Sequence, residues 1–149
     1  MKKAFYLTKE GIEELKKEQA ELVAQRGPIA ERIKTAREFG DLAENAEYSS
    51  ARQEQEKVEG RISEIENILL NAEVIKAPKK DSKVQLGSTV TLSGADNKDK
   101  QFQVVGTVEA DPLHGKISDE SPIGKALMGQ KVGASIAIKD AKFKITAIA

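Results

Sequence analysis

The sequence predicts an α+β protein in which a long antiparallel α-helical coiled-coil hairpin precedes a small, mostly antiparallel β domain with one short helix. Across the first half, apolar residues recur at alternating spacings of three and four, which is typical of a coiled-coil seam. After a polar segment that contains Pro78, the apolar spacing changes to two, which indicates strands. We therefore place the hairpin at residues 1–76 and the second domain at residues 77–149.

The apolar positions of the two predicted arms pair around a common midpoint at Leu42. This symmetry predicts that the chain folds back there and lifts residues 41–44 to the far end of a long hairpin. The first arm contributes Ile12, Leu15, Leu22, Ile29, Ile33 and Ala36 to the seam, and the second contributes Tyr48, Ala51, Val58, Ile62, Ile65, Leu69 and Ala72.

The ends of the two helices follow from local signals. We expect Thr8 to be the N-cap of the first helix, and Gly40 to end that helix. Pro28 lacks an amide hydrogen, so we expect a kink or a local break in this arm. The second helix is expected to start at Asp41 or a little later and to reach about Ala72.

The second domain is expected to contain short strands and one short helix. Ser121 is a good N-cap and is followed by a proline at the first helical position, so a helix should run from there to Gly129. The expected strands are 84–86, 88–92 and 102–108, followed by a hairpin of 134–138 and 142–148 that turns at Asp140-Ala141.

Composition excludes several classes of protein. The 149 residues carry no net charge: residues 1–76 have 13 Lys+Arg against 16 Asp+Glu, and residues 77–149 have 11 against 8. Neither half has the basic excess of a stand-alone duplex-DNA binder. The absence of cysteine excludes a disulfide framework and a cysteine metal site. With no signal-peptide pattern and no long apolar stretch, we expect a cytoplasmic protein without membrane contact.

Acidic residues gather at the predicted tip, where Glu38 and Glu47 flank Asp41 and Glu44. A structural interpretation is a capping box, in which Asp41 caps the second helix and Glu44 bonds back to the cap amide. A functional interpretation is a metal site, because carboxylates three residues apart near a helix start are close enough to share a Mg²⁺ ion. The two interpretations are compatible, and the sequence leaves both open.

The tip offers too few ligands to hold a metal ion by itself. Asn45 is at most a weak ligand, and His114, the only histidine, lies in the other domain. The pattern therefore indicates a metal site completed by another protein. Arg37 and Arg52 stand near the acids and could contact an RNA backbone or an acidic partner surface. They could equally be ordinary helix charges, paired for example with Glu56.

The segment Ala36–Tyr48, with the sequence AREFGDLAENAEY, resembles the tip of the bacterial Gre transcript-cleavage factors. The similarity continues in order along nearly the whole chain. The arms lack an extended basic face, which favours the GreA branch over GreB. The further matching segments are 51–55, 59–62, 71–75, 86–90, 115–118 and 121–127.

This resemblance implies an FKBP-like fold for residues 77–149, which would dock on RNA polymerase. The hairpin would enter the secondary channel of the polymerase, where Asp41 and Glu44 would help to hold a Mg²⁺ ion that is shared with it. Cleavage of the 3′ end of backtracked RNA would follow, with Arg37 and Arg52 near the transcript. The chain would then be no enzyme itself but a monomeric factor that stimulates the polymerase and rescues arrested complexes. The family also carries DNA binding among its expected properties.

Ala43 stands where the family commonly has serine, so a hydroxyl contact is missing at the tip.

Three alternatives remain from the sequence. An inhibitory Gre-like paralogue would share the fold but have a different, more acidic tip. A peptidyl-prolyl isomerase would need an aromatic-lined pocket, yet Phe102 and Phe143 are the only aromatic residues after the linker. A non-catalytic coiled-coil adaptor of RNA polymerase would not need the tip carboxylates.

Overall fold

The computed structural model describes residues 4–40, 44–76, 78, 83–95 and 98–149. The chain divides into two compact units. One unit joins Met1–Gly11 to Ala72–Ala149, and the other is Ile12–Asn71. Among the described residues, no helix has the length and apolar character needed to cross a membrane.

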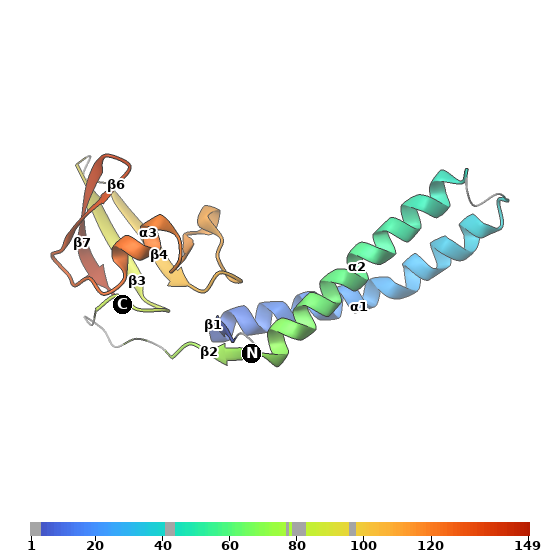
Figure 1. The fold of residues 1–149 in the computed structure, drawn as a ribbon, viewed down its shortest axis with the longest axis horizontal. Coiled ribbons are helices and arrows are strands. Elements are labelled where there is room, and N and C mark those ends of the chain that lie inside the picture. Colours follow the sequence, from blue (N-terminus) through green and yellow to red (C-terminus); the bar gives the residue numbers. More distant parts are fainter. Residues whose placement is uncertain (1–3, 41–43, 77, 79–82, 96–97) are drawn as a thin grey trace. The chain divides into compact units, whose positions relative to one another are not determined.

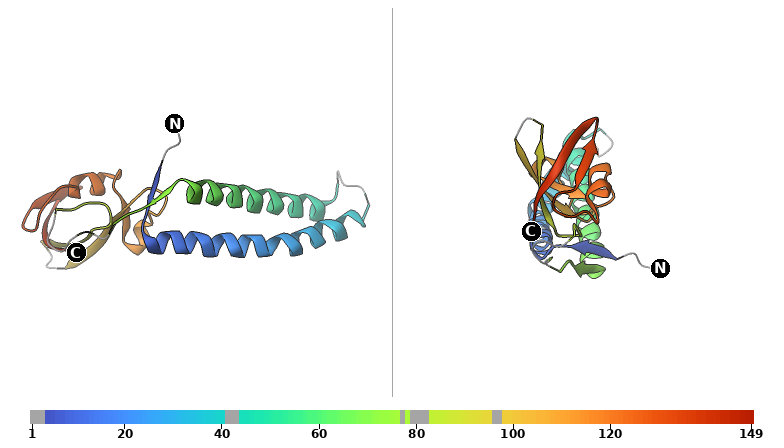
Figure 2. Two further views of the ribbon diagram at one scale, coloured as in Figure 1. Left: turned by 90° about the horizontal axis from the view of Figure 1, so that it is seen from below. Right: turned by 90° about the vertical axis from the view of Figure 1, so that its left-hand side faces the viewer.

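The helical unit is an antiparallel hairpin, as the sequence predicts. Helices α1 (Lys9–Arg37) and α2 (Ala46–Leu70) run side by side in opposite directions in both sets of views (Figures 1 and 2). The predicted seam is confirmed over most of its length, because its members form one buried cluster. This cluster contains Ile29, Ile33, Ala51, Val58 and Ile62, with Leu22 and Tyr48 packed against it.

The seam prediction is wrong near the C-terminal end of α2. Ile68 is buried there, whereas the predicted Leu69 is only partly buried. Both residues follow Ile65 at spacings that share one helix face, so local spacing cannot choose between them. The predicted seam residue Ala72 lies beyond α2, in a strand.

Two of the three predictions for α1 are confirmed, and one is wrong. The amide of Gly11 donates to Thr8 Oγ1 at 3.0 Å, which confirms Thr8 as the N-cap. Gly40 has a φ of 110°, a conformation that suits glycine, and it follows the end of the helix. The predicted possibility of a break at Pro28 is wrong, since α1 continues through it. Ala24 is exposed, so water can serve the carbonyl that Pro28 leaves without a donor.

The unit formed by Met1–Gly11 and Ala72–Ala149, called the β-sheet unit below, contains a short parallel strand pair that the sequence analysis did not predict. Strand β1 (Phe5–Leu7) pairs with β2 (Ala72–Val74) in parallel, with Phe5 opposite Ala72. The amide of Ile75 extends this pairing by donating to the Leu7 carbonyl at 2.7 Å.

The same unit contains a five-stranded sheet, ordered β5-β4-β3-β7-β6, in which only the β4–β5 pair is parallel. Its buried core includes Val90, Leu92, Val104, Leu127 and Ile145. The elements are β3 (Thr89–Gly94), β4 (Asp99–Val105), the 3₁₀ turn η1 (Pro112–His114), β5 (Lys116–Ser118), α3 (Pro122–Leu127), β6 (Ser135–Ile138) and β7 (Ala141–Ile148).

The predicted α+β class is confirmed, and the differences lie at element ends. Ser121 caps α3 as predicted, by accepting a hydrogen bond from the Gly124 amide at 3.0 Å. Residues 84–86 are not a strand, the predicted strand 102–108 stops at Val105, and β5 was missed. The last hairpin turns at Lys139 and Asp140, which both have positive φ, so Ala141 already belongs to β7.

Candidate functional site

Asn45, rather than an acidic residue, caps helix α2 at the tip of the hairpin. Its Oδ1 accepts a hydrogen bond from the Tyr48 amide at 3.1 Å, and its Nδ2 donates to the Ala36 carbonyl on the opposite arm at 2.6 Å. The predicted capping box is therefore wrong, because Glu44 precedes the N-cap of α2 instead of lying inside its first turn. Both functional groups of the Asn45 side chain are thus engaged in holding the turn.

Of the two predicted tip carboxylates, Glu44 lies within the described residues and Asp41 does not. Glu44 is exposed and lies outside both helices. Glu38 and Glu47, on either side of the turn, are also exposed. Since Glu44 has no capping role, its carboxylate is available for contacts with another molecule.

A carboxylate at this position has the chemistry that Mg²⁺ prefers, because this ion takes oxygen ligands and usually only one or two from protein carboxylates. Within the described part of the chain, no three or more His, Cys, Asp or Glu side chains come together as a metal site. Asp41, Glu44, Glu38 and Glu47 all have the side-chain type that fits a shared ion.

The structure brings Arg37 and Arg52 together. Both line a shallow hollow of about 290 Å³ below the tip, which Lys34 and Glu38 also line. The Arg37 guanidinium lies 5.8 Å from the centre of the Tyr48 ring, a cation–π distance. Arg52 Nη1 donates to Gln55 Oε1 at 2.7 Å. These neighbours orient two cations on the side of the hairpin next to its acidic end.

Ion pairs link the two arms at several levels. Arg26 pairs with Glu59 at 2.9 Å, and Arg32 pairs with Glu54. Arg61 forms a two-pronged pair with Glu18 at 2.7 and 2.8 Å. The Arg61 hydrogen bond lowers the pKa of the Glu18 carboxyl, and the Glu18 carboxylate raises the pKa of Arg61. Together with the seam, these pairs hold the two ends of the tip opposite one another.

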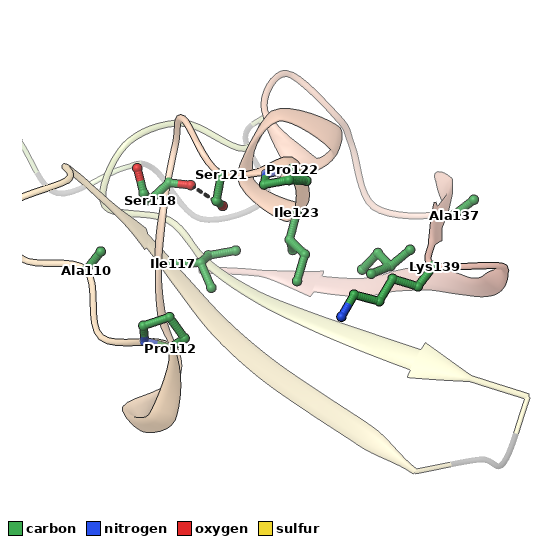
Figure 3. Close-up of a pocket in the computed structure, with 10 residues that line it drawn as sticks. Ala110, Pro112, Ile117, Ser118, Ser121, Pro122, Ile123, Ala137 and Lys139 are labelled. Carbon is green, nitrogen blue, oxygen red and sulfur yellow. Dashed lines mark hydrogen bonds between the residues drawn. The ribbon is translucent and has the colours of Figure 1, made fainter.

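The β-sheet unit contains an apolar pocket of about 350 Å³ (Figure 3). Ile117 from β5 and Ile123 from α3 form its apolar walls, and Lys139 from the last hairpin turn lies at its rim (Figure 3). Ser121 donates to the Ser118 carbonyl at 2.6 Å and so holds the start of α3 against β5. None of the ten lining residues is aromatic, so this pocket does not have the aromatic lining that a prolyl isomerase would need.

His114 lies on an exposed turn, with Nδ1 2.6 Å from a carboxylate oxygen of Asp111. Its side chain is 76% exposed. His114 is the last residue of the 3₁₀ turn η1.

A buried carboxylate that the sequence analysis missed holds the start of α1. Glu109 accepts hydrogen bonds from the amide of Thr8, at 3.0 Å, and from its hydroxyl. Only 4% of the Glu109 side chain is exposed, and Lys116 Nζ lies 3.7 Å away. A Cβ on Gly11 would lie 2.6 Å from the Glu109 carboxylate, so the Glu109 side chain would have to shift to admit a larger residue there. No local signal could have found this contact, because its partners are 101 residues apart.

Comparison with known proteins agrees with this two-part architecture. Residues 5–74 match the family model described as the N-terminal domain of a transcription elongation factor. Residues 78–149 match the model for the GreA/GreB C-terminal domain of such factors. The chain therefore belongs to the GreA/GreB family of transcription elongation factors.

Curated relatives resemble the chain over most of their length. A transcription elongation factor GreA from Leuconostoc mesenteroides is 49% identical over 140 residues, covering 91% of this chain and 87% of the relative. The GreA of Mycoplasma capricolum is 46% identical over 152 residues, covering 98% and 97%. A solved structure of the transcription factor Gfh1 is 30% identical, covers 99% of both chains and has a TM-score of 0.50.

Proposed function

We propose that this chain is a transcription elongation factor that acts with RNA polymerase and stimulates Mg²⁺-dependent cleavage of the 3′ end of backtracked RNA. Membership of the GreA/GreB family and relatives named GreA support the elongation role. The observation that carries the cleavage role is Glu44, an exposed carboxylate beside a helix that is capped by another residue. The factor is not an enzyme by itself but completes a site of the polymerase.

Asp41 and Glu44 are the residues that would hold Mg²⁺ jointly with the polymerase. The chemistry that such an ion would supply is Lewis-acid assistance to phosphodiester hydrolysis. Asn45 contributes by fixing where the chain enters α2, directly after Glu44. This bond between the arms limits the freedom of the tip, so less conformational entropy is lost when the carboxylate binds.

Arg37 and Arg52 would contact the phosphates of the displaced transcript. Their shared hollow places two guanidinium groups and the Lys34 ammonium on one side of the hairpin. Guanidinium groups bind phosphate strongly because they donate parallel hydrogen bonds. Any DNA contact of this chain would also have to use local groups of this kind, because neither half has a strong basic excess.

The apolar pocket of the β-sheet unit is our candidate for docking on the polymerase. A pocket with an apolar lining and a lysine at its rim suits an apolar side chain flanked by an acid. Ala137→Glu would place a charge in this pocket and should weaken polymerase binding at least tenfold. Ser135→Glu is the matched control, because Ser135 is exposed on the same strand but does not line the pocket.

The experiment that tests the function is RNA cleavage in purified, backtracked RNA polymerase complexes with Mg²⁺, comparing this chain with its Asp41→Ala variant. Strong stimulation by the parent and near-background cleavage by the variant, with equal polymerase binding, would support the proposal. Binding without stimulation by the parent would overturn it and favour an inhibitory paralogue. Equal function of parent and variant in elongation assays would favour a non-catalytic adaptor.

A further inference from the structure

Lysines gather at one end of the five-stranded sheet. Strand β3 is antiparallel to both β4 and β7, so the β3–β4 turn and the β6–β7 turn lie at the same end, where Gly94 is opposite Phe143 (Figure 1). The Lys100 Nζ lies 5.5 Å from the centre of the Phe143 ring, so the two hairpins are neighbours there. We call this set of lysines the basic end, and it consists of Lys98, Lys100, Lys139, Lys142 and Lys144.

The charge of the basic end is not balanced locally. All five lysines are exposed, and those of the β6–β7 hairpin form no ion pair among the described residues. Two described acids, Asp99 and Asp140, stand beside the five lysines, and Asp96 lies outside the described residues. The other described acids of residues 83–149 all fall within 109–120, in the segments around β5. This separation of charge makes the basic end attractive to an anionic partner.

The side chains next to the lysines favour a nucleic acid over a protein as that partner. Lys142 and Lys144 alternate with the core residues Phe143 and Ile145, so both stand on the face of the sheet that is opposite to the core. A stable protein interface has an apolar centre, whereas the neighbours on this face carry hydroxyl and amide groups. Such groups, like lysines, donate hydrogen bonds to phosphate oxygens. The neighbours are Thr91, Ser93 and Gln101.

We propose that the basic end binds the sugar–phosphate backbone of the displaced RNA. The proposal rests on the proposed function, which makes the displaced transcript the nucleic acid that this factor meets. The neighbouring side chains offer no aromatic face for stacking, so the contact is with phosphates and 2′-hydroxyls and has no sequence preference. Because the chain carries no net charge, the contact is weak in the free chain and gains strength when polymerase holds the factor beside the RNA.

The first test measures binding of a single-stranded RNA of about 15 nucleotides to the free chain at several salt concentrations. Lys142→Glu with Lys144→Glu should weaken binding about 10- to 100-fold and reduce the slope of log affinity against log salt by about 1.4, because two phosphate contacts are lost. Lys142→Arg with Lys144→Arg keeps both charges and should bind like the parent.

The matched control for this test is Lys125→Glu with Lys131→Glu. It changes the net charge by the same amount, at exposed positions outside the basic end. Because salt screens charges that are far from the RNA, this control should stay within about threefold of the parent.

The second test compares backtracked polymerase complexes whose displaced RNA is about 2 or about 20 nucleotides long. The tip and the basic end belong to different units of the chain, so only the long segment can contact both. For the long segment, Lys142→Glu with Lys144→Glu should raise the factor concentration that gives half-maximal cleavage by about 10-fold. On the short segment, the same variant should match the parent.

Four results would overturn the inference. The first is no detectable RNA binding by the parent, and the second is equal RNA binding by the basic-end variant and the matched control. Tighter binding of duplex DNA than of RNA, lost in the basic-end variant, would identify DNA as the partner instead. Weaker binding of that variant to polymerase without nucleic acid would identify an acidic protein surface. If the parent fails to stimulate cleavage of either segment, the proposed function fails, and RNA binding by the free chain still decides this inference.

Discussion

The two units of the chain bury their apolar residues in different ways. The β-sheet unit has a core formed from several strands and α3, in which Val90, Leu92 and Ile145 have no exposed surface. The helical hairpin buries one seam between two helices and leaves most other positions to water. The β-sheet unit has an apolar pocket between β5, α3 and the last hairpin turn. The helical hairpin has charged side chains around a hollow near its tip. The proposed function divides docking and chemistry between these two units.

The largest expected effect sharpens the chemical side of this comparison. Glu44→Ala should reduce stimulated RNA cleavage about 100-fold, because loss of a carboxylate ligand removes roughly 3 kcal/mol of stabilisation from the metal-assisted step. Thermal unfolding should change by no more than about 0.5 kcal/mol, since Glu44 is exposed and does not cap α2. A cleavage assay and a melting curve on the same preparation measure both.

Asn45→Ala is the structural control for Glu44. It should lower the stability of the hairpin by about 1 kcal/mol, because it removes the cap of α2 and the bond to Ala36. If Glu44→Ala destabilised the protein as much as Asn45→Ala does, Glu44 would have a structural role after all.

The second prediction is that the two units unfold independently, and the comparison between them would fail if they unfolded as one. Leu92→Ala and Ile62→Ala each remove a buried side chain and should each cost about 2–5 kcal/mol. Leu92→Ala should speed hydrogen exchange in β3 and β7, and Ile62→Ala should do so in α1 and α2. The measurement is residue-resolved amide exchange of both variants. Uniform acceleration across both units by either variant would show a single cooperative unit.

A smaller effect is expected where Glu109 holds the start of α1. Glu109→Ala should destabilise the protein by about 1–3 kcal/mol, because it leaves the Thr8 amide and hydroxyl without their acceptor. Glu109→Gln keeps one acceptor oxygen and should cost less. Urea unfolding compares the two variants. Equal stability of Glu109→Ala and the parent would show that water replaces the carboxylate without loss.

The smallest effect concerns pH and the Glu18–Arg61 pair. The folded state lowers the pKa of Glu18 below its ordinary value of 4.5, so the pair stabilises the protein above that pH. This stabilisation is lost as the pH falls through the lowered pKa. Both side chains are more than a third exposed, so its size should be about 0.5 kcal/mol or less.

Glu18→Gln tests this pair directly. The variant should be less stable than the parent near neutral pH and should approach it in acid, as measured by urea unfolding at several pH values. A difference that stays constant down to about pH 3 would mean that the Glu18 charge does not contribute.

The sequence predicted a structural feature correctly where its local pattern is compatible with only one structure. Alternating spacings of three and four identified the seam because both arms repeat them over many turns. Thr8 and Ser121 were found as caps because each stands directly before its helix. At the site, the sequence placed Arg37 and Arg52 near the acidic tip but did not predict that they line the same hollow.

The sequence failed where two local solutions were equally good. Asp41 with Glu44 fits a capping box as well as Asn45 fits an N-cap, and the bond from Asn45 to Ala36 on the other arm favours the second. The choice between Ile68 and Leu69 was of the same kind. The parallel pairing of β1 with β2 joins strands of three residues, which are too short to leave a periodic pattern.

The sequence by itself determined the class of the fold, the antiparallel helical hairpin and the residue types at the tip, because these depend on periodicity and on neighbours along the chain. The predicted fold-back point, Leu42, lies outside the described residues. Only the tertiary structure decided which residue caps α2, that Glu109 is buried against Thr8, and that Arg37 and Arg52 line one hollow. Each of those features depends on groups that are distant in sequence or on different faces of a helix. Burial, hydrogen bonding and charge act through space, so they become fixed only when the chain has folded.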